Sequence, residues 1–298
     1  MAFNPTVIEK GLQARFAQAM AEMQAARSIN PGLRSTVLEV PSTGAYEKYG
    51  WLGAMPAVQQ WVGSRNSKEF ESYEYTIKNL DWETSVPIFE NDFDDDQTGS
   101  YAMLSAMLAR RIEVHPEKLI ADLLIDGTSK LAYDGIAFFS DVSAPRAIDN
   151  LLGGTGVTLA LMEADLNAAL TAMAKFDDDQ GEILNIKGNL IICPVAMQRN
   201  FERLVSSETD PTATAVGTFN PYRGLRVIGD ARLDADDVSD WYLLATNEIV
   251  KPFIYQNRQN GQSSMEKTNH TKQWVFGADY RSNAGYALPH LAIKTVNS

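Results

Sequence analysis

The chain has 298 residues, of which 45% are hydrophobic and 21% charged. This composition is typical of a globular protein, excludes a largely disordered chain, and supplies enough apolar surface for one large domain or two ordinary ones. The 38 acidic residues outnumber the 26 basic ones, for a net charge of −12. No basic run provides the patch that nucleic-acid-binding proteins carry, so sequence-specific DNA binding is not expected.

The first expected element is a helix from Pro5 to Arg27, where apolar residues recur at three- and four-residue steps after the cap and first-turn proline of Asn4-Pro5. Its other face carries Gln and Ala, which suits contact with another subunit as well as with the chain's own core. The first residues lack a basic region and a long apolar core, so we expect no signal peptide. No stretch reaches the ~18 apolar residues of a membrane helix, and a cytoplasmic protein is expected.

The segment from Val37 to Lys78 is rich in aromatic residues, Gly and Pro. Within it, Glu71 to Lys78 alternates with the period of a strand, and a second strand is expected from Trp82 to Phe89. Large rigid side chains without long aliphatic runs make a poor independent core, whereas aromatics dominate the hot spots of protein interfaces. This segment is therefore expected to dock on another molecule.

The longest expected helix runs from about Thr98-Gly99-Ser100 to Asp126, where Gly127 ends it. Pro116 implies a bend or a break after His115. Residues 141–156 read as a linker.

A helix at 159–176 follows, and then a strand at 190–193 with a helix at 196–205, which together form a β-α unit. Residues 206–222 read as a surface loop. These elements predict an α+β fold with a central insertion between about 147 and 245. The remaining expected strands are Leu225–Ile228, Trp241–Ala245, Phe253–Tyr255, Trp274–Tyr280 and Leu288–Thr295.

The residues that carry enzyme chemistry elsewhere form no recognisable site here. His115, His270 and His290 fall in unrelated segments without paired spacing, which favours surface or hydrogen-bonded histidines over metal ligands. Cys193, the single cysteine, lies in an apolar run, so we expect a buried, inert thiol in a reducing compartment. No nucleophile elbow, Walker loop or dinucleotide fingerprint is present. The chain is expected to be no enzyme and to need no cofactor or metal.

Two acidic clusters allow one alternative. Asp92 and Asp94–Asp96 precede the long helix, and Asp177–Asp179 lie in a turn. Carboxylates so close together could cage a divalent cation, as in a metal-dependent enzyme. The helix dipole and the turn account for both clusters without a metal, and this structural interpretation is favoured. Tight binding of Mg²⁺ or Mn²⁺, lost on Asp94→Ala and Asp95→Ala, would favour the enzyme.

Three segments, taken in order, resemble the Mu-like major head subunit family of phage and prophage capsid proteins. The first is Tyr49–Gly53 followed by Pro56 and Trp61–Arg65, the second is Val86–Phe93, and the third is Phe276–Tyr286. The resemblance extends from about Val37 to the C-terminus, and the order and spacing of the three segments make it specific.

The resemblance implies the Hong Kong 97-type capsid fold. It implies an N-terminal arm at residues 1–35, and an extended loop with adjoining strands at 36–90, the loop proper at about 41–78. A peripheral domain with a long spine helix is implied at 91–146 and 246–298, and an axial domain at 147–245.

The resemblance also implies a major capsid (head) protein of a Mu-like tailed phage or prophage. Such a subunit self-assembles into the hexamers and pentamers of an icosahedral shell around double-stranded DNA. It would be located in the virion, assemble in the bacterial host cytoplasm, and have scaffold, portal and decoration proteins as partners. An encapsulin-like nanocompartment subunit, which shares the fold, is the alternative. The candidates for contacts between subunits are Tyr49, Trp51, Leu52, Trp61, Arg65, Lys68, Tyr73 and Tyr75.

Overall fold

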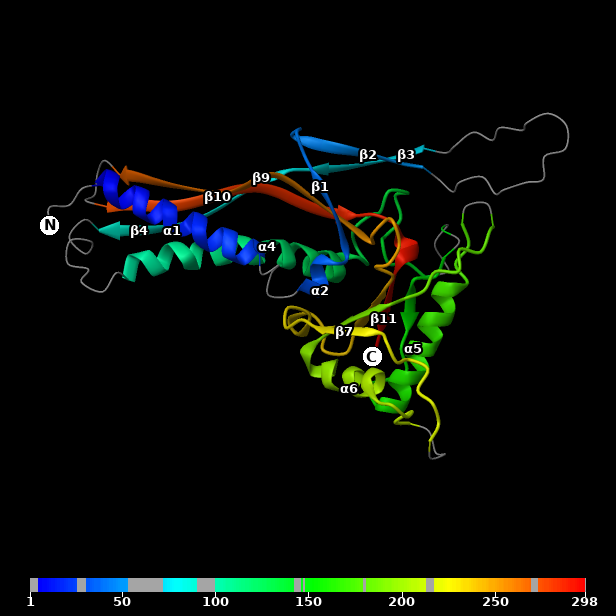
Figure 1. Ribbon diagram of the computed structural model, residues 1–298. Helices are drawn as coiled ribbons and strands as arrows, with labels where there is room; N and C mark the ends of the chain where they lie inside the picture. The colour runs from blue at the N-terminus through cyan, green and yellow to red at the C-terminus, as the bar shows by residue number, and fades with distance from the viewer. Residues whose placement is uncertain are drawn as a thin grey trace.

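The computed structural model describes residues 5–25, 31–52, 72–89, 100–141, 146, 148–178, 181–212, 217–268 and 273–297. Two β-sheets, one of four and one of five strands, are joined by one long helix. Figure 1 shows an elongated part, built from the long strands and helices, and a second part that carries the C-terminus.

The four-stranded sheet has the order β1-β9-β10-β4, with β1 parallel to β9 and the other neighbours antiparallel. Along β4, side chains alternate between a more buried and an exposed face. Those of Trp82, Val86 and Ile88 are more buried than their neighbours. The two helices that pack on this sheet are α1 and α4 (Figure 1). The bounds are β1 Val37–Pro41, β4 Leu80–Phe89, β9 Phe253–Thr268, β10 Gln273–Tyr286, α1 Pro5–Ala25 and α4 Ser100–Asp126.

The core under α1 is a single apolar cluster. Leu12, Phe16 and Met20 of α1 are buried against the N-terminal half of α4 and against β9 and β10. The three residues are four positions apart, which places them on one face of the helix. This cluster therefore fastens α1 to the body of the subunit.

Helix α4 continues through Pro116, so the break that was expected there as an alternative to a bend does not occur. A proline in a helix removes one backbone hydrogen bond and crowds the carbonyl groups of the preceding turn. The guanidinium of Arg34, in the short helix α2 (Pro31–Arg34), donates to the carbonyl oxygen of Glu113 at 3.1 Å. This bond ties α2 to α4 three residues before the proline.

The five-stranded sheet has the order β5-β11-β8-β6-β7. Strands β6 and β7 are parallel and connected through α6, so the expected β-α unit is part of a β-α-β crossover. The bounds are β5 Leu151–Gly153, β6 Leu190–Cys193, β7 Arg226–Gly229, β8 Trp241–Leu244, β11 Ala292–Val296, α5 Leu159–Ala174, α6 Val195–Ser206, η1 Leu233–Ala235 and η2 Pro289–Leu291.

Strand β6 is buried on both faces and separates two cores. Ile191 and Cys193 belong to the cluster under α5 and α6. Leu190 and Ile192 belong to a second cluster, which includes the C-terminal half of α4 and the start of β9. An all-apolar strand is the pattern of a sheet covered on both sides. The second cluster makes α4 and the five-stranded sheet one packed unit.

The C-terminal third differs from the expected pattern of strands. Strand β11, in the segment 246–298 that was expected in the peripheral domain, pairs with β8 and β5 in the five-stranded sheet. Strand β9 extends for 16 residues, whereas only Phe253–Tyr255 was expected. Its second half is polar and lacks the alternation that marks a strand, and its pairing along β10 compensates for this.

Candidate inter-subunit site: the β2–β3 hairpin

The β2–β3 hairpin is a separate two-stranded sheet that extends away from the four-stranded sheet (Figure 1). Strands β2 (Tyr46–Leu52) and β3 (Ser72–Lys78) are antiparallel, with Tyr49 opposite Tyr75 and Trp51 opposite Tyr73. An isolated two-stranded hairpin is marginally stable in water. The hairpin therefore depends on what its root contacts in the rest of the subunit.

The apolar side of the root packs against the ends of β9 and β10. Ile77 is buried with Ile254 and Ala287, and Tyr49 and Tyr75 pack against this small cluster. A side chain at Gly285 would collide with Ile77, at 2.5 Å from its Cδ1, so glycine is needed for this close approach.

Burial raises the pKa of both tyrosines at the root. That of Tyr49 rises to about 12, with the nearby carboxylate of Glu47 as the second cause. The pKa of Tyr75 is raised by burial, which outweighs its hydrogen bond from the backbone N–H of Tyr286. Both phenols therefore stay neutral at physiological pH.

The polar side of the root is organised by Glu47. Its Oε1 accepts hydrogen bonds from Ser42 Oγ at 2.8 Å and from the backbone N–H groups of Thr43 and Gly44 at 2.9 and 3.0 Å. These bonds, led by that from Gly44, lower the pKa of Glu47. The turn that leads into β2 is thus held by one carboxylate.

The other face of the same strands is exposed to solvent, because the side chains alternate between the two faces. Tyr46 is 55% exposed, and the ion pair between Lys48 and Glu74 is more than half exposed on both sides. An exposed ion pair contributes little to stability. This exposed face of the described hairpin thus presents surface that a neighbour could cover.

The eight contact candidates fall into three groups. Tyr49 and Tyr75 lie at the root and pack within their own subunit. The backbone positions of Trp51, Leu52 and Tyr73 are in the paired strands. The other three candidates, Trp61, Arg65 and Lys68, lie outside the described residues.

Three residues at the root were not anticipated from the sequence. Ser42, Asn79 and Gln256 are 7%, 2% and 0% exposed and hydrogen bonded to one another or to the hairpin. Single polar residues at strand ends form no motif. The one available signal is Asn79, a polar residue between two strand-like runs, where a chain reversal or a junction is expected.

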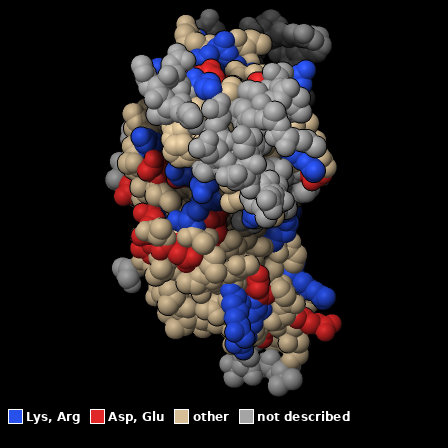
Figure 2. All heavy atoms as spheres, turned by 90° about the vertical axis from the view of Figure 1, so that its left-hand side faces the viewer, with Lys and Arg blue, Asp and Glu red and all other residues tan. Residues whose placement is uncertain are grey.

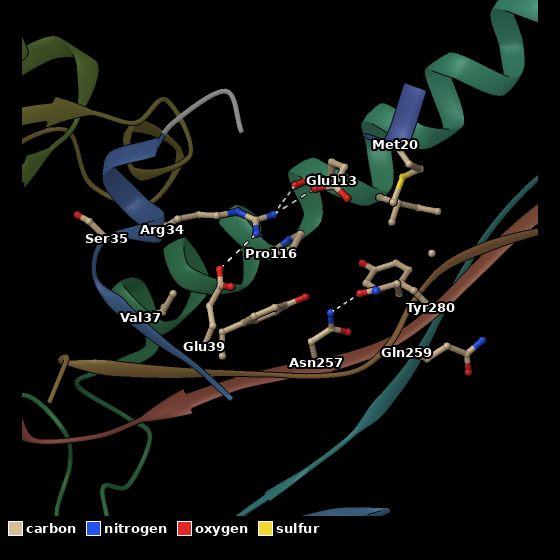
Figure 3. A pocket seen from close by; sticks show the side chains of 14 residues that line it. Met20, Arg34, Ser35, Val37, Glu39, Glu113, Pro116, Asn257, Gln259 and Tyr280 are labelled. Atoms are coloured by element: carbon tan, nitrogen blue, oxygen red, sulfur yellow. Dashed lines mark hydrogen bonds and ion pairs between the residues drawn. The ribbon is translucent and has the colours of Figure 1, made fainter. Parts of the chain in front are cut away.

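A cavity of about 640 Å³ opens between α1, α4, β1 and β9. Figure 3 shows Arg34 across it, paired with Glu39 and Glu113 at 3.5 Å each. Tyr280 also lines the cavity, and burial raises the pKa of its phenol. The lining is polar, yet no group of three or more His, Cys, Asp or Glu side chains within the described ranges is arranged to hold a metal.

The remaining candidates for chemistry occupy structural positions. The ring of His115 lies between Trp82 and Tyr280, with centroids 4.3 and 5.7 Å away, and that of His290 meets Phe176 edge-on at 6.4 Å. His270 is outside the described residues. Burial, as expected, raises the pKa of the Cys193 thiol to about 12.

Of the acidic clusters, one is described in part. Asp178 Oδ1 accepts the backbone N–H of Glu182 at 2.9 Å and Asp177 forms a bridge with Ile183, which is the geometry of a turn. Asp92, Asp94–Asp96 and Asp179 are outside the described residues.

Charges of both signs are interspersed on the face shown in Figure 2, without one continuous basic surface among the residues coloured there. Among the helices that the structure describes, none is long and apolar enough to cross a membrane.

Two curated relatives are similar in sequence. The chain is 40% identical to the major capsid protein of Escherichia phage Mu over 100 residues, which are 34% of this chain and 33% of that protein. It is 26% identical to the Mu-like prophage FluMu major head subunit of Haemophilus influenzae over 259 residues, 85% of this chain. The alignments thus span about a third and 62% of the relatives' own lengths.

Solved phage capsids share the fold. A chain of the procapsid of bacteriophage JBD30 matches 99% of this chain with a TM-score of 0.54 and 22% identity, covering 77% of the JBD30 chain. The SrpI encapsulin of Synechococcus elongatus also matches, with a TM-score of 0.57 and 13% identity over 90% of this chain and 88% of its own. The α+β Hong Kong 97-type capsid fold is therefore confirmed, but the fold alone does not separate a phage capsid from an encapsulin.

The sequence family makes that separation. The family model described as Mu-like prophage major head subunit gpT matches residues 6–150, 154–233 and 227–298, which is nearly the whole chain. The chain belongs to the Mu-like prophage major head subunit gpT family.

Proposed function

We propose that the protein is the major capsid subunit of a Mu-like tailed phage or prophage. Copies assemble into hexamers and pentamers and close into an icosahedral shell that encloses double-stranded DNA. The match to the head-subunit family along nearly the entire chain carries the proposal. Heterologous contacts that close into rings are the way in which identical subunits build such a shell.

The proposed domain assignment follows the two sheets. Residues 1–35 are the N-terminal arm, and the β2–β3 hairpin and its tip, within 36–90, form the extended loop that lies on a neighbour. The long helix and the four-stranded sheet form the peripheral domain. The five-stranded sheet with α5 and α6 forms the axial domain, which then includes β11 in addition to 147–245.

We propose that the subunit acts by binding other proteins and not by catalysing a reaction. Scaffold, portal and decoration proteins are the proposed partners, and the virion is the proposed location after assembly in the host cytoplasm. Arg65 and Lys68, in the segment between β2 and β3, are proposed to pair with acidic groups of a neighbouring subunit. The net charge of −12 keeps the wall from adhering to the DNA it encloses.

Negative-stain electron microscopy of the purified chain, alone and with its scaffold protein, tests the proposal directly. Closed particles of uniform diameter are expected. A protein that remains monomeric at high concentration under both conditions contradicts it.

Replacement of one aromatic side chain tests the role of the segment between β2 and β3. Trp61→Ala should leave the monomer folded, with an unchanged circular dichroism spectrum, and reduce the yield of particles, because Trp61 is assigned to a contact between subunits. Phe219→Ala, at a site 71% exposed and remote in sequence, is the matched control and should assemble normally. If the Trp61→Ala monomer loses its folded circular dichroism spectrum, Trp61 belongs to the subunit's own core instead.

A further inference from the structure

The root of the β2–β3 hairpin contains a ring of hydrogen-bonded side chains that begins and ends on β2. Tyr49 donates its hydroxyl to Gln256 Oε1 at 3.1 Å, and Gln256 Nε2 donates to Asn79 Oδ1 at 2.7 Å. Asn79 Nδ2 donates to Ser42 Oγ at 2.7 Å, and Ser42 Oγ donates to Glu47 Oε1 at 2.8 Å. The ring links the hairpin to β9 and to the junctions on either side of it.

Backbone groups complete the bonding of the two central amides. Gln256 Nε2 also donates to the carbonyl of Ile77 at 3.1 Å, and Asn79 Nδ2 to that of Gly44 at 2.9 Å. Asn79 is 2% and Gln256 0% exposed. A buried polar network whose members all have partners is stable and directional, whereas a half-satisfied one is costly.

The apolar contacts at the root cannot supply this directionality. Ile77 and the two tyrosines bury only a small cluster, and hydrophobic contact depends little on angle. Hydrogen bonds weaken steeply away from their preferred geometry. The ring is therefore the part of the root that selects one orientation of the hairpin.

We propose that Asn79 and Gln256 are positioning residues that hold the β2–β3 hairpin at one angle to the four-stranded sheet before the subunit meets a neighbour. The hairpin is then preorganised, so docking does not have to restrict its orientation. The consequence for assembly rests on the proposed function, but the angle itself is a property of the single subunit.

The angle is measured as a distance between two spin labels in dilute, unassembled full-length protein. Gly50→Cys places one label on an exposed position of β2 with no neighbour within 4 Å, and Lys130→Cys places the other on an exposed turn after α4. Cys193→Ala removes the buried native thiol. Double electron–electron resonance should give one narrow distance distribution, and a broad one would overturn the proposal.

Asn79→Ala and Gln256→Ala should broaden or split that distribution. Asn79→Asp keeps the side-chain shape and the acceptor but loses both donors, and it should broaden the distribution as well. This variant keeps the test valid if the alanine variants do not fold. If the variants, above all Asn79→Asp, keep the narrow distribution of the parent, the proposal is wrong.

Asn220→Ala is the matched control. Asn220 is 0% exposed, donates to Leu204 and Ser207 carbonyls, and accepts from the N–H of Tyr222, all near α6. Its loss should lower the denaturation midpoint to a similar extent and leave the distance unchanged. A broadening in this control as large as in the hairpin variants would show that general destabilisation, rather than the ring, moves the hairpin.

Particle formation then separates the two proposals. If the parent protein forms no shells but the distances respond as expected, the proposed function fails and the positioning role stands. If shells form with uniform size from the parent and the ring variants alike, and the distances do not respond, the positioning role fails alone.

Discussion

At the scale of single residues, the surroundings of His115 favour its neutral form over the charged one. Burial is the main cause that lowers its pKa, and the charge of Lys118 on the next turn adds to it. The ring lies between those of Trp82 and Tyr280. The unfolded chain therefore binds a proton at a higher pH than the folded subunit does.

This difference predicts a loss of stability in acid. Above the ordinary histidine pKa of about 6.5 both states are neutral, and below it the unfolded state is protonated first, so the free energy of unfolding falls as the pH is lowered. His115→Phe should remove this part of the dependence. Urea denaturation of both proteins from pH 7.5 to 5 checks it, and parallel curves would contradict it, because all other titrating groups are shared.

At the scale of elements, α1 is attached through one face only. Phe16 is 3% exposed and lies between Leu12 and Met20 in the cluster against α4. Phe16→Ala should cost about 3–5 kcal/mol of the docking free energy of the helix. Hydrogen exchange should then accelerate in residues 9–22 and change little in β10, whereas Gln18→Ala, on the exposed face, should have no effect. Acceleration over the whole chain would mean that α1 is part of the global folding unit.

The elements also show what the sequence reveals and what it does not. Strong apolar periodicity located α4 and α5 to within about two residues, and the apolar run located β6. The second half of β9 was missed because its glutamines and serines have no apolar period, and its pairing is imposed by β10. The sheet that β11 joins was also missed, since pairing partners are a tertiary property.

The candidate site was predictable in the same uneven way. Strand β3 was predicted because Glu71 to Lys78 alternates, and the aromatic character of the segment was evident, but β2 was not expected as a strand. Asn79 and Gln256 could not be recognised, because they are 177 positions apart and only the folded sheet brings their amides together.

At the scale of the whole molecule, an aromatic group joins the two sheets. Phe138 is fully buried, stacks on Tyr286 with centroids 4.5 Å apart, and lies 4.9 Å from Phe139 and 5.5 Å from Phe253. These residues come from the segment after α4 and from the ends of β9 and β10 nearest the five-stranded sheet. The contact is shared by both halves of the subunit.

Phe138→Ala should therefore destabilise both halves together, by about 3–5 kcal/mol. Trp241 reports on the five-stranded sheet and Trp82 on the four-stranded one, so single-tryptophan versions can follow each half in urea. The two transitions should shift by the same amount and remain coincident. Separate transitions would show that the halves unfold independently.

The unbroken course of α4 through Pro116 has a mechanical consequence. Its 27 residues span roughly 40 Å as one helix, with one end in the core beneath α1 and the other in the core of the five-stranded sheet. A rod of that length turns a tilt of about 5° at one end into a displacement of roughly 3.5 Å at the other. A small rotation of one half of the subunit therefore displaces the other half through α4, and no part of the chain between them has to unfold.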